Sequence, residues 1–272
     1  MNGAPMTSDP RAGTTDEASQ HRSEMALVVG GTRGIGRAVC LNIASRYARI
    51  AVMYRSDEAA AGSVAQEIER RGAEPLLLKA DIRDADLVAT MVNQSAADYG
   101  RLDLLVHCAG SLTDWQPVRD LTPTAWRQYI DSDLNGFFNV VNAALRIMHE
   151  QKSGNIVAVT SISSRAASPF SSQSAAAKAG VEAMIRVIAR EEGRFGIRAN
   201  AVAAGLTDTE QGQHAIEHWG AETAKRIIQQ SAIPRIGTAD EVARVVAFLA
   251  SPDASYVTGR ILAADGGQFI SA

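Results

Sequence analysis

Short, almost uninterrupted apolar runs alternate with longer helical patterns along most of this chain. Two examples are ALVVG at Ala26–Gly30 and LDLLVH, which ends at His107. Runs with hardly a polar break are typical of parallel strands that helices cover on both faces. Repeated strand–helix units of this kind therefore predict an α/β fold with a doubly wound, parallel sheet.

The predicted strands share this apolar character and are separated by stretches of helix length. They are Ala26–Gly30, Ile50–Tyr54, Pro75–Ala80, Leu102–His107, Asn155–Thr160, Arg198–Ala203 and Arg260–Ala264, with helical stretches such as Ala59–Arg71, Asp84–Tyr99 and Ser174–Arg194. No linker-like break interrupts the alternation, so residues 25–272 are predicted to form a single domain.

The first 24 residues differ from the rest because they contain almost no large apolar side chains. We expect residues 1–24 to form a disordered tail, since they have neither the apolar core of a signal peptide nor the composition of a transit peptide. No apolar run is long enough to span a bilayer, and a net charge of −3 offers no basic field for nucleic acid. Two cysteines, Cys40 and Cys108, make no disulfide framework, so a cytoplasmic protein is expected.

A glycine-rich loop, GGTRGIG, follows the first predicted strand and precedes a helical pattern. Its glycines allow a tight turn, close backbone approach to a pyrophosphate, and close packing of helix on strand. The helix N-terminus then offers free N–H groups and a positive dipole end to phosphate. An ordinary glycine turn is the alternative, but the position after the first strand of a β-α series favours a dinucleotide site.

The spacing G-x-x-x-G-x-G resembles that of the short-chain dehydrogenase/reductases, and among them the ketoacyl-reductase-like members. The resemblance extends from Met25 to Gly267 and is also carried by Asp81-Ile82, His107-Cys108-Ala109-Gly110, Asp133-Leu134-Asn135-Gly136, Ser161, Lys178 in AAAKAGVEAM, IRANAVAAG and the terminal ADGG. It implies a Rossmann fold with a seven-stranded sheet and a nicotinamide dinucleotide. No metal site is predicted.

The resemblance assigns nucleotide binding to residues in the glycine loop and near the ends of the strands. They are Gly30, Thr32, Arg33, Gly34, Ile35, Gly36, Tyr54, Arg55, Ser56, Asp81, Ile82, Cys108, Ala109, Gly110, Lys178, Gly205 and Thr207. An acid at the end of the second strand would bind the ribose hydroxyls and repel a 2′-phosphate, but this strand ends in Tyr-Arg-Ser. Arg33 and Arg55 suit that phosphate, so we expect NADP(H). The alternative is that both are solvated surface arginines.

The resemblance also implies four catalytic roles. A Ser orients the substrate oxygen, a Tyr donates the proton, a Lys holds the nicotinamide ribose, and an Asn organises a water chain. Ser161 and Lys178 match the Ser and the Lys, and Asp133 stands at the Asn position. The Tyr position, four residues before Lys178, holds Ser174, and no tyrosine lies between Ser161 and Lys178.

This departure has a chemical consequence. An aliphatic hydroxyl is a far weaker acid than a phenol of pKa about 10, and Ser174 is shorter by a whole ring. A water could bridge the gap, as a less well placed donor. We therefore predict a divergent member of the family, with Ser161, Ser174, Lys178 and Asp133 as its candidate catalytic residues.

Some of these residues admit a second role. Lys178 could activate Ser174 as a nucleophile, because the two share a helix face, although commitment of Lys178 to the ribose is favoured. Asp133 could pair with Lys178 or support a water relay. His107 ends a predicted strand beside the nucleotide, where packing or cofactor contact is favoured over catalysis.

Three further segments are interpreted from the resemblance. Ile162–Gln173, which contains Arg165, is expected to line the substrate cleft, although its serines could be loop solubilisers. Thr207–Gln230 is expected to form the substrate lid. The helix Asp240–Ala250 and the final Gly-Gly-Gln-Phe-Ile resemble elements that bury subunit interfaces, so a homo-oligomer, tetramer or dimer, is expected.

The leading functional hypothesis is NADPH-dependent reduction of a ketone or aldehyde on a small or polyketide-like molecule, with modified proton delivery. One alternative is a non-redox catalyst, such as a cyclase, isomerase or dehydratase, that keeps the nucleotide as a structural element. Another is an NADP(H)-binding pseudoenzyme. The expected partner is a small-molecule substrate, with no nucleic acid and no membrane.

Overall fold

Seven strands form one sheet in the order β3-β2-β1-β4-β5-β6-β9, and every pair of neighbours is parallel. They are β1 (Met25–Val29), β2 (Arg49–Tyr54), β3 (Glu74–Lys79), β4 (Leu104–His107), β5 (Gly154–Ser161), β6 (Ile197–Ala204) and β9 (Ile261–Ala264). The predicted doubly wound Rossmann fold with a seven-stranded parallel sheet is confirmed. The computed structural model describes residues 24–270, so all but the last residue of the predicted tail lies outside the described residues.

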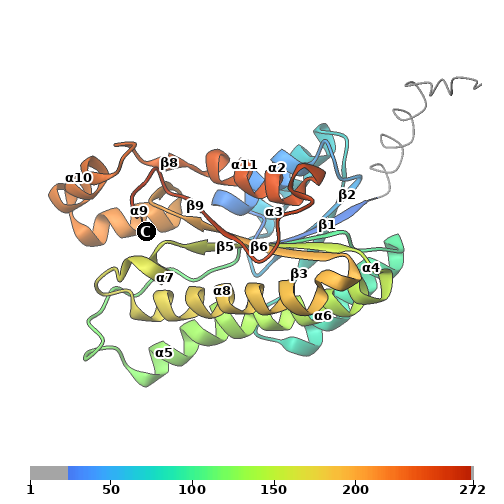
Figure 1. Cartoon of the computed structure of the whole chain (residues 1–272), viewed down its shortest axis with the longest axis horizontal. Coiled ribbons are helices and arrows are strands. Elements are labelled where there is room, and N and C mark those ends of the chain that lie inside the picture. The colour runs from blue at the N-terminus through green and yellow to red at the C-terminus, as the bar shows by residue number, and fades with distance from the viewer. Residues whose placement is uncertain (1–23, 271–272) are drawn as a thin grey trace, which may run out of the picture.

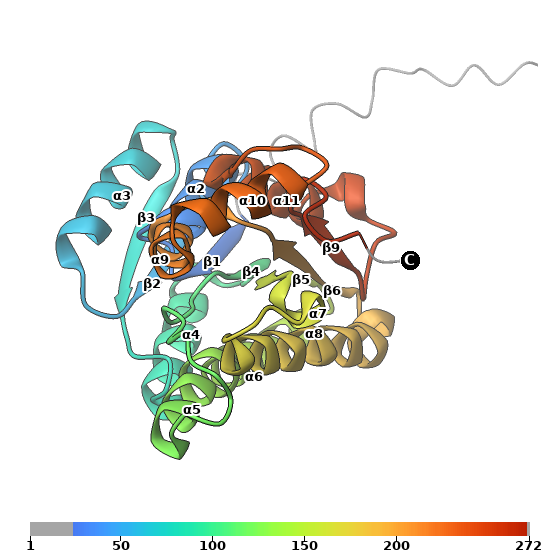
Figure 2. The same ribbon diagram turned by 90° about the vertical axis from the view of Figure 1, so that its left-hand side faces the viewer.

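Helices cover both faces of the sheet (Figures 1 and 2). On one face are α2 (Gly34–Ile43), α3 (Glu58–Arg70) and α11 (Ala239–Ala250), and on the other are α4 (Ala85–Tyr99), α6 (Gly136–Gln151) and α8 (Ser172–Glu192). Each face has its own buried cluster. Val39 and Leu249 pack in the first, and Phe137 and Met148 in the second. This double cover explains why the strands carry apolar residues on both sides.

Shorter elements connect these layers, the first three after the carboxyl ends of β4 and β5 and the last two before the amino ends of β6 and β9. They are α5 (Pro123–Ile130), the π-helix η2 (Asp131–Asn135), α7 (Ser163–Ala166), and the 3₁₀ helices η3 (Gly193–Phe195) and η4 (Pro252–Ala254). The π-helix interrupts what would otherwise be one helix from α5 into α6. Single π turns of this kind are frequent at functional sites.

The predicted lid segment is an excursion between β6 and α11. It consists of β7 (Thr207–Asp208), α9 (Glu210–Trp219), α10 (Ala221–Gln230) and β8 (Gly237–Thr238), with β7 and β8 paired in parallel. In Figures 1 and 2 this orange segment extends beyond one end of the sheet. That is the end at which ligands bind in open α/β sheets, where the strand order reverses between β1 and β4.

No helix between residues 24 and 270 is long and apolar enough to cross a membrane. Within the same range, no group of three or more His, Cys, Asp or Glu side chains is placed to hold a metal ion.

Candidate active site

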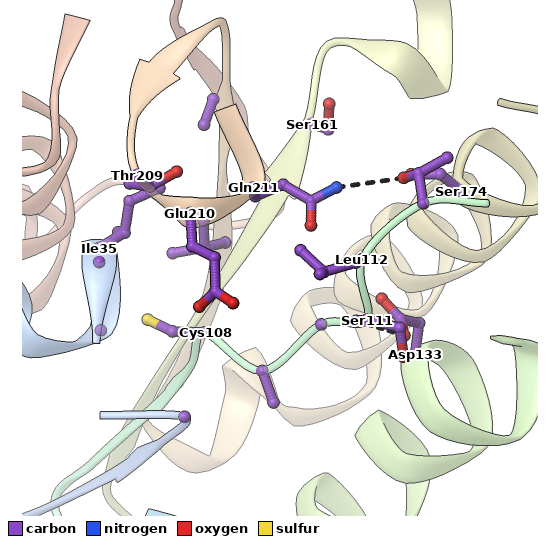
Figure 3. Close-up of a pocket in the computed structure, with 18 of the residues that line it drawn as sticks. Ile35, Cys108, Ser111, Leu112, Asp133, Ser161, Ser174, Thr209, Glu210 and Gln211 are labelled. Carbon is purple, nitrogen blue, oxygen red and sulfur yellow. Dashed lines mark hydrogen bonds between the residues drawn. The ribbon is translucent and has the colours of Figure 1, made fainter. Parts of the chain in front are cut away.

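A cleft of about 810 Å³ lies at the carboxyl ends of the strands, and every residue that the sequence predicted for the site lines it. The predicted cofactor residues and the four candidate catalytic residues are therefore brought together. The structure adds residues that the prediction missed, among them Asp57, Thr113, Tyr129, Glu210 and Gln211. Figure 3 shows part of this lining.

The glycine loop is packed so closely that side chains are excluded at two positions. Gly30 has a φ of +74°, and a Cβ there would lie 2.8 Å from the Ala109 backbone nitrogen. A Cβ on Gly36 would lie 2.0 Å from the Gly30 carbonyl oxygen. The first turn of α2 is therefore pressed against the end of β1. Its free N–H groups face the cleft, which is the arrangement that a pyrophosphate requires.

Arg33 already has two carboxylate partners. Its guanidinium pairs with Asp57 and, at 3.1 Å, with Glu210 at the start of α9. Asp57 also caps α3 by accepting a hydrogen bond from the backbone nitrogen of Ala60 at 2.9 Å. Arg55, by contrast, is exposed at the edge of the same cleft. Arg33 and Arg55 were both predicted to bind the 2′-phosphate, but they differ in how much of their positive charge is already balanced by neighbouring carboxylates.

Asp81 and Ile82, two of the predicted cofactor residues, are held by contacts with their neighbours. The Asp81 carboxylate accepts a hydrogen bond from Arg83 Nε at 2.9 Å, which with the charge of Arg83 lowers the pKa of Asp81 to about 2. The Ile82 carbonyl accepts from Asn139 Nδ2 at 2.9 Å, and its side chain packs on Gly136. These contacts fix the backbone between β3 and α4 at the rim of the cleft.

Lys178 and Asp133 form a buried ion pair beneath the loop that follows β4. Lys178 Nζ lies 3.1 Å from Asp133 Oδ1, and the Asp133 side chain is fully buried in the π-helix. Asp133 Oδ2 accepts from the backbone nitrogen of Ser111 at 3.0 Å. Burial is the largest single influence and lowers the pKa of Lys178, but the charge of Asp133, the neighbouring Tyr129 and the hydrogen bond with Asp133 together outweigh it, so the pKa is raised. A lysine held protonated is poorly suited to deprotonate Ser174, so the nucleophile alternative loses its base.

Ser161 and Ser174 reach the cleft from different elements, as Figure 3 shows. Ser161 ends β5, where its Oγ accepts a hydrogen bond from the backbone nitrogen of Ser163 at 3.1 Å. Ser174 lies in the first turn of α8, one turn before Lys178, and is 7% exposed. Both hydroxyls line the cleft.

Tyr129, near the end of α5, also lines the cleft, although only 6% of it is exposed. Its hydroxyl donates to the Ser111 carbonyl at 3.4 Å. Sequence reasoning missed this residue. A tyrosine on an amphipathic helix is an ordinary core residue, and its distance along the chain from Ser174 gave no signal of proximity.

Two residues near the predicted site, His107 and Arg165, make packing or ion-pair contacts outside the cleft. His107 does not line the cleft and packs edge-to-face on Phe137, with ring centroids 5.1 Å apart. Burial, followed by the charge of Lys178, lowers its pKa to about 3. Arg165 likewise does not line the cleft and pairs with the buried carboxylate of Glu182 at 3.2 Å. The prediction that Ile162–Gln173 lines the cleft thus holds for some of its residues only.

The lid is tied to the loop between β4 and α5 by polar and aromatic contacts. Gln211 Nε2 donates to Thr113 Oγ1 at 3.1 Å, the dashed bond in Figure 3, and His214 Nε2 lies 3.0 Å from the Thr113 carbonyl oxygen. The ring of Trp115 stacks on that of His218, with centroids 5.2 Å apart, and contacts the ring of Trp219 edge-to-face. α9 is therefore held against the loop that follows β4, at the edge of the cleft.

Comparisons with known proteins agree with this geometry. A family model described as enoyl-(acyl carrier protein) reductase matches residues 29–268. The chain belongs to the short-chain dehydrogenase/reductase family. It is 33% identical to a 3-oxoacyl-[acyl-carrier-protein] reductase of Staphylococcus aureus (strain N315) over 248 residues, which cover 91% of this chain and 99% of the relative. A reductase of the same name from Synechocystis sp. is also 33% identical, over 90% of this chain and 97% of its own length.

Solved structures of the family have the same fold. The crystal structure of levodione reductase superposes with a TM-score of 0.86 at 32% identity, covering 90% of this chain and 97% of that one. A short-chain type dehydrogenase/reductase from Mycobacterium ulcerans gives 0.85 at 30% identity, covering 90% and 89%. The chain is thus placed in a family of oxidoreductases that use nicotinamide cofactors.

Proposed function

We propose that this protein is an NADPH-dependent reductase of a ketone or aldehyde carried by a small or polyketide-like molecule. The observation that carries the proposal is the shared cleft, in which the glycine cradle, Ser161 and the Lys178–Asp133 pair face one space. The resemblance to 3-oxoacyl-[acyl-carrier-protein] reductases supports reduction of a carbonyl group.

The cradle fits a dinucleotide because Gly30 and Gly36, where a Cβ would clash with backbone, let the loop and the first turn of α2 pack closely, as a pyrophosphate site requires. When bound, the reduced nicotinamide supplies a hydride to the carbonyl carbon. Lys178, held by Asp133, binds the ribose, and Ser161 orients the carbonyl oxygen. The lid residues Gln211 and Trp219 line the same cleft and exclude water from the substrate.

Selectivity for NADPH over NADH is assigned chiefly to Arg55. It is exposed at the rim, whereas the charge of Arg33 is already matched by Asp57 and Glu210. A guanidinium group suits a 2′-phosphate because it offers several donors and a permanent charge.

We further propose that Ser174 stands where the family keeps its catalytic tyrosine, so that proton delivery is modified. One turn before Lys178 on α8, this position faces the cleft with a hydroxyl of low acidity. The same observation favours the second candidate function, a non-redox catalyst or a pseudoenzyme that retains the nucleotide.

Cofactor oxidation distinguishes the two candidates. NADPH binding is measured by calorimetry, and NADPH oxidation is followed with a panel of ketones and aldehydes that includes β-keto thioesters. The reductase predicts slow but measurable oxidation that depends on the carbonyl. Tight binding of NADPH without oxidation by any carbonyl favours the second candidate.

A homo-oligomer is also proposed. Phe248 on α11 is 43% exposed and Ile270 is 79% exposed, in the two segments that the resemblance assigns to subunit interfaces. Light scattering is expected to give a dimer or tetramer, and Phe248→Glu is expected to lower that mass.

A further inference from the structure

A phenol stands beside Ser174, although it comes from another helix. Tyr129 of α5 lines the cleft together with Ser174 and Lys178. Burial and then the charge of Asp133 raise the pKa of Tyr129. Lys178 and hydrogen bonds with the hydroxyls of Ser174 and Thr113 lower it in part. The phenol thus shares the cleft with both candidate catalytic residues of α8, on a helix that packs beside α8.

The surroundings of the phenol hold it in this place. Its hydroxyl donates to the Ser111 carbonyl at 3.4 Å, and Ser111 in turn donates its backbone N–H to Asp133 and lies 3.1 Å, Oγ to Oγ, from Ser132. Ser111 therefore joins the phenol to the ion pair. Asp133 on η2 and Lys178 on α8 are the charged groups that act on Tyr129.

We propose that Tyr129 is the proton source of this cleft, and that Ser174 passes its proton through a bound water to the substrate oxygen. The inference rests on the proposed reductase function. The hydroxyl of Ser174 alone is too weak an acid and too short, whereas a phenol is an acid of the kind that this chemistry needs. Tyr129 acts through Ser174, so its role is that of a positioned proton source.

The step balances as follows. The carbonyl carbon gains a hydride from the reduced nicotinamide dinucleotide, and its oxygen gains a proton from the bridging water. That water takes the proton of the Ser174 hydroxyl. The Tyr129 O–H, which donates to the Ser111 carbonyl in the structure, turns to Ser174 and replaces the proton that Ser174 has given up. The phenolate, close to Lys178, then regains a proton from solvent. In total, the carbonyl, the reduced dinucleotide and a solvent proton give the alcohol and the oxidised dinucleotide.

The coupling is tested first in the resting protein, without turnover. Tyrosines are labelled with ¹³C at Cζ, and the resonance of Tyr129 is assigned by its loss in Tyr129→Phe. Ser174→Ala is expected to shift this resonance, because it removes a hydrogen bond to the phenol. Ser172→Ala, on the same helix but outside the cleft lining, is the matched control and should leave it in place.

The role in the reaction is tested by single-turnover reduction at several pH values. Tyr129→Phe and Ser174→Ala are each expected to slow the step about 10²-fold or more, with little change in NADPH affinity. The double variant is expected to be no slower than either, because the residues act as one chain. Wild-type rates should fall at high pH as the phenol ionises, and Tyr129→Phe should lack that fall. Tyr99→Phe, on α4 outside the cleft, is the control.

The outcomes separate this inference from the function on which it rests. An active wild type whose Tyr129→Phe variant keeps the same rate and pH profile overturns the inference alone. A Tyr129 resonance whose chemical shift is unchanged in Ser174→Ala also overturns the inference alone. A wild type that binds NADPH but reduces no carbonyl overturns both.

Discussion

The cleft has a half that is expected to bind the nucleotide and a half that holds the candidate catalytic residues, and the two differ in whether backbone or side chains form them. The nucleotide half is formed by backbone, with Gly30 and Gly36 packed so closely that no Cβ fits. The catalytic half is formed by the side chains of Tyr129, Asp133 and Lys178, which come from α5, η2 and α8. A backbone site tolerates no substitution that adds volume, whereas a side-chain site can change its chemistry within the same shape. The proposed loss of the catalytic tyrosine would therefore leave the nucleotide cradle intact.

The largest effect is expected from Gly36→Ala. The added methyl group would lie 2.0 Å from the Gly30 carbonyl oxygen, so α2 must move away from β1 and the phosphate cradle opens. We expect NADPH affinity to fall at least ~100-fold in calorimetry, because the loop makes the defining phosphate contacts.

The matched control for this change is Gly62→Ala on α3. A Cβ at Gly62 would meet nothing within 4 Å, so alanine is expected to stabilise the protein by about 0.5–1 kcal/mol and leave binding unchanged. Wild-type affinity in Gly36→Ala would contradict the backbone account of the nucleotide half.

The next effect is on stability, from Asp133→Ala. Removing the carboxylate leaves the Lys178 charge buried without a partner, which costs about 3–5 kcal/mol in comparable pairs. Urea denaturation at pH 7 measures this loss. Asp120→Ala, at an exposed carboxylate, should change the free energy of unfolding by less than about 1 kcal/mol. Equal small losses in both would show that the pair contributes little.

The Lys178–Asp133 pair also predicts how the free energy of unfolding depends on pH. The folded-state pKa of Lys178 is raised above its ordinary 10.5, so its stabilisation is fully present below that pH. It is lost as pH rises through the raised value. The stability difference between wild type and Asp133→Ala should therefore shrink only at strongly alkaline pH, and a constant difference up to unfolding would contradict the pairing.

A third change, Ser174→Tyr, tests the proposal that Ser174 stands where the family keeps its catalytic tyrosine. We expect reduction to be faster than in wild type by about 10²-fold, since a well-placed general acid contributes 10²–10⁴-fold. In this background Tyr129→Phe should cost little, because the proton no longer comes from α5. If Ser174→Tyr leaves the rate of a turning-over enzyme unchanged, the alignment of Ser174 with the catalytic tyrosine is wrong.

The sequence predicted the strands and the parallel sheet well, because both depend on local patterns. Apolar runs place each strand within two residues of its observed ends, and the glycine loop follows β1 directly. Contacts between distant segments could not be predicted. Tyr129 meets Ser174 only because the loop after β4 and the π-helix bring α5 beside α8, and Glu210 meets Arg33 only because the lid returns to the glycine loop. Neither depends on a local pattern.

The smallest predicted effect separates the two arginines of the nucleotide half. Arg55→Asp is expected to weaken NADPH about tenfold or more while changing NADH little, because it removes a charged partner of the 2′-phosphate and adds a repelling charge. Arg33→Ala should weaken NADPH only a few-fold, since Asp57 and Glu210 already balance that guanidinium. Calorimetry with both dinucleotides measures the ratio. Equal losses of affinity for NADPH and NADH in Arg55→Asp would show that the 2′-phosphate does not bind at Arg55. A larger loss from Arg33→Ala would mean that its carboxylate partners release it when the nucleotide binds.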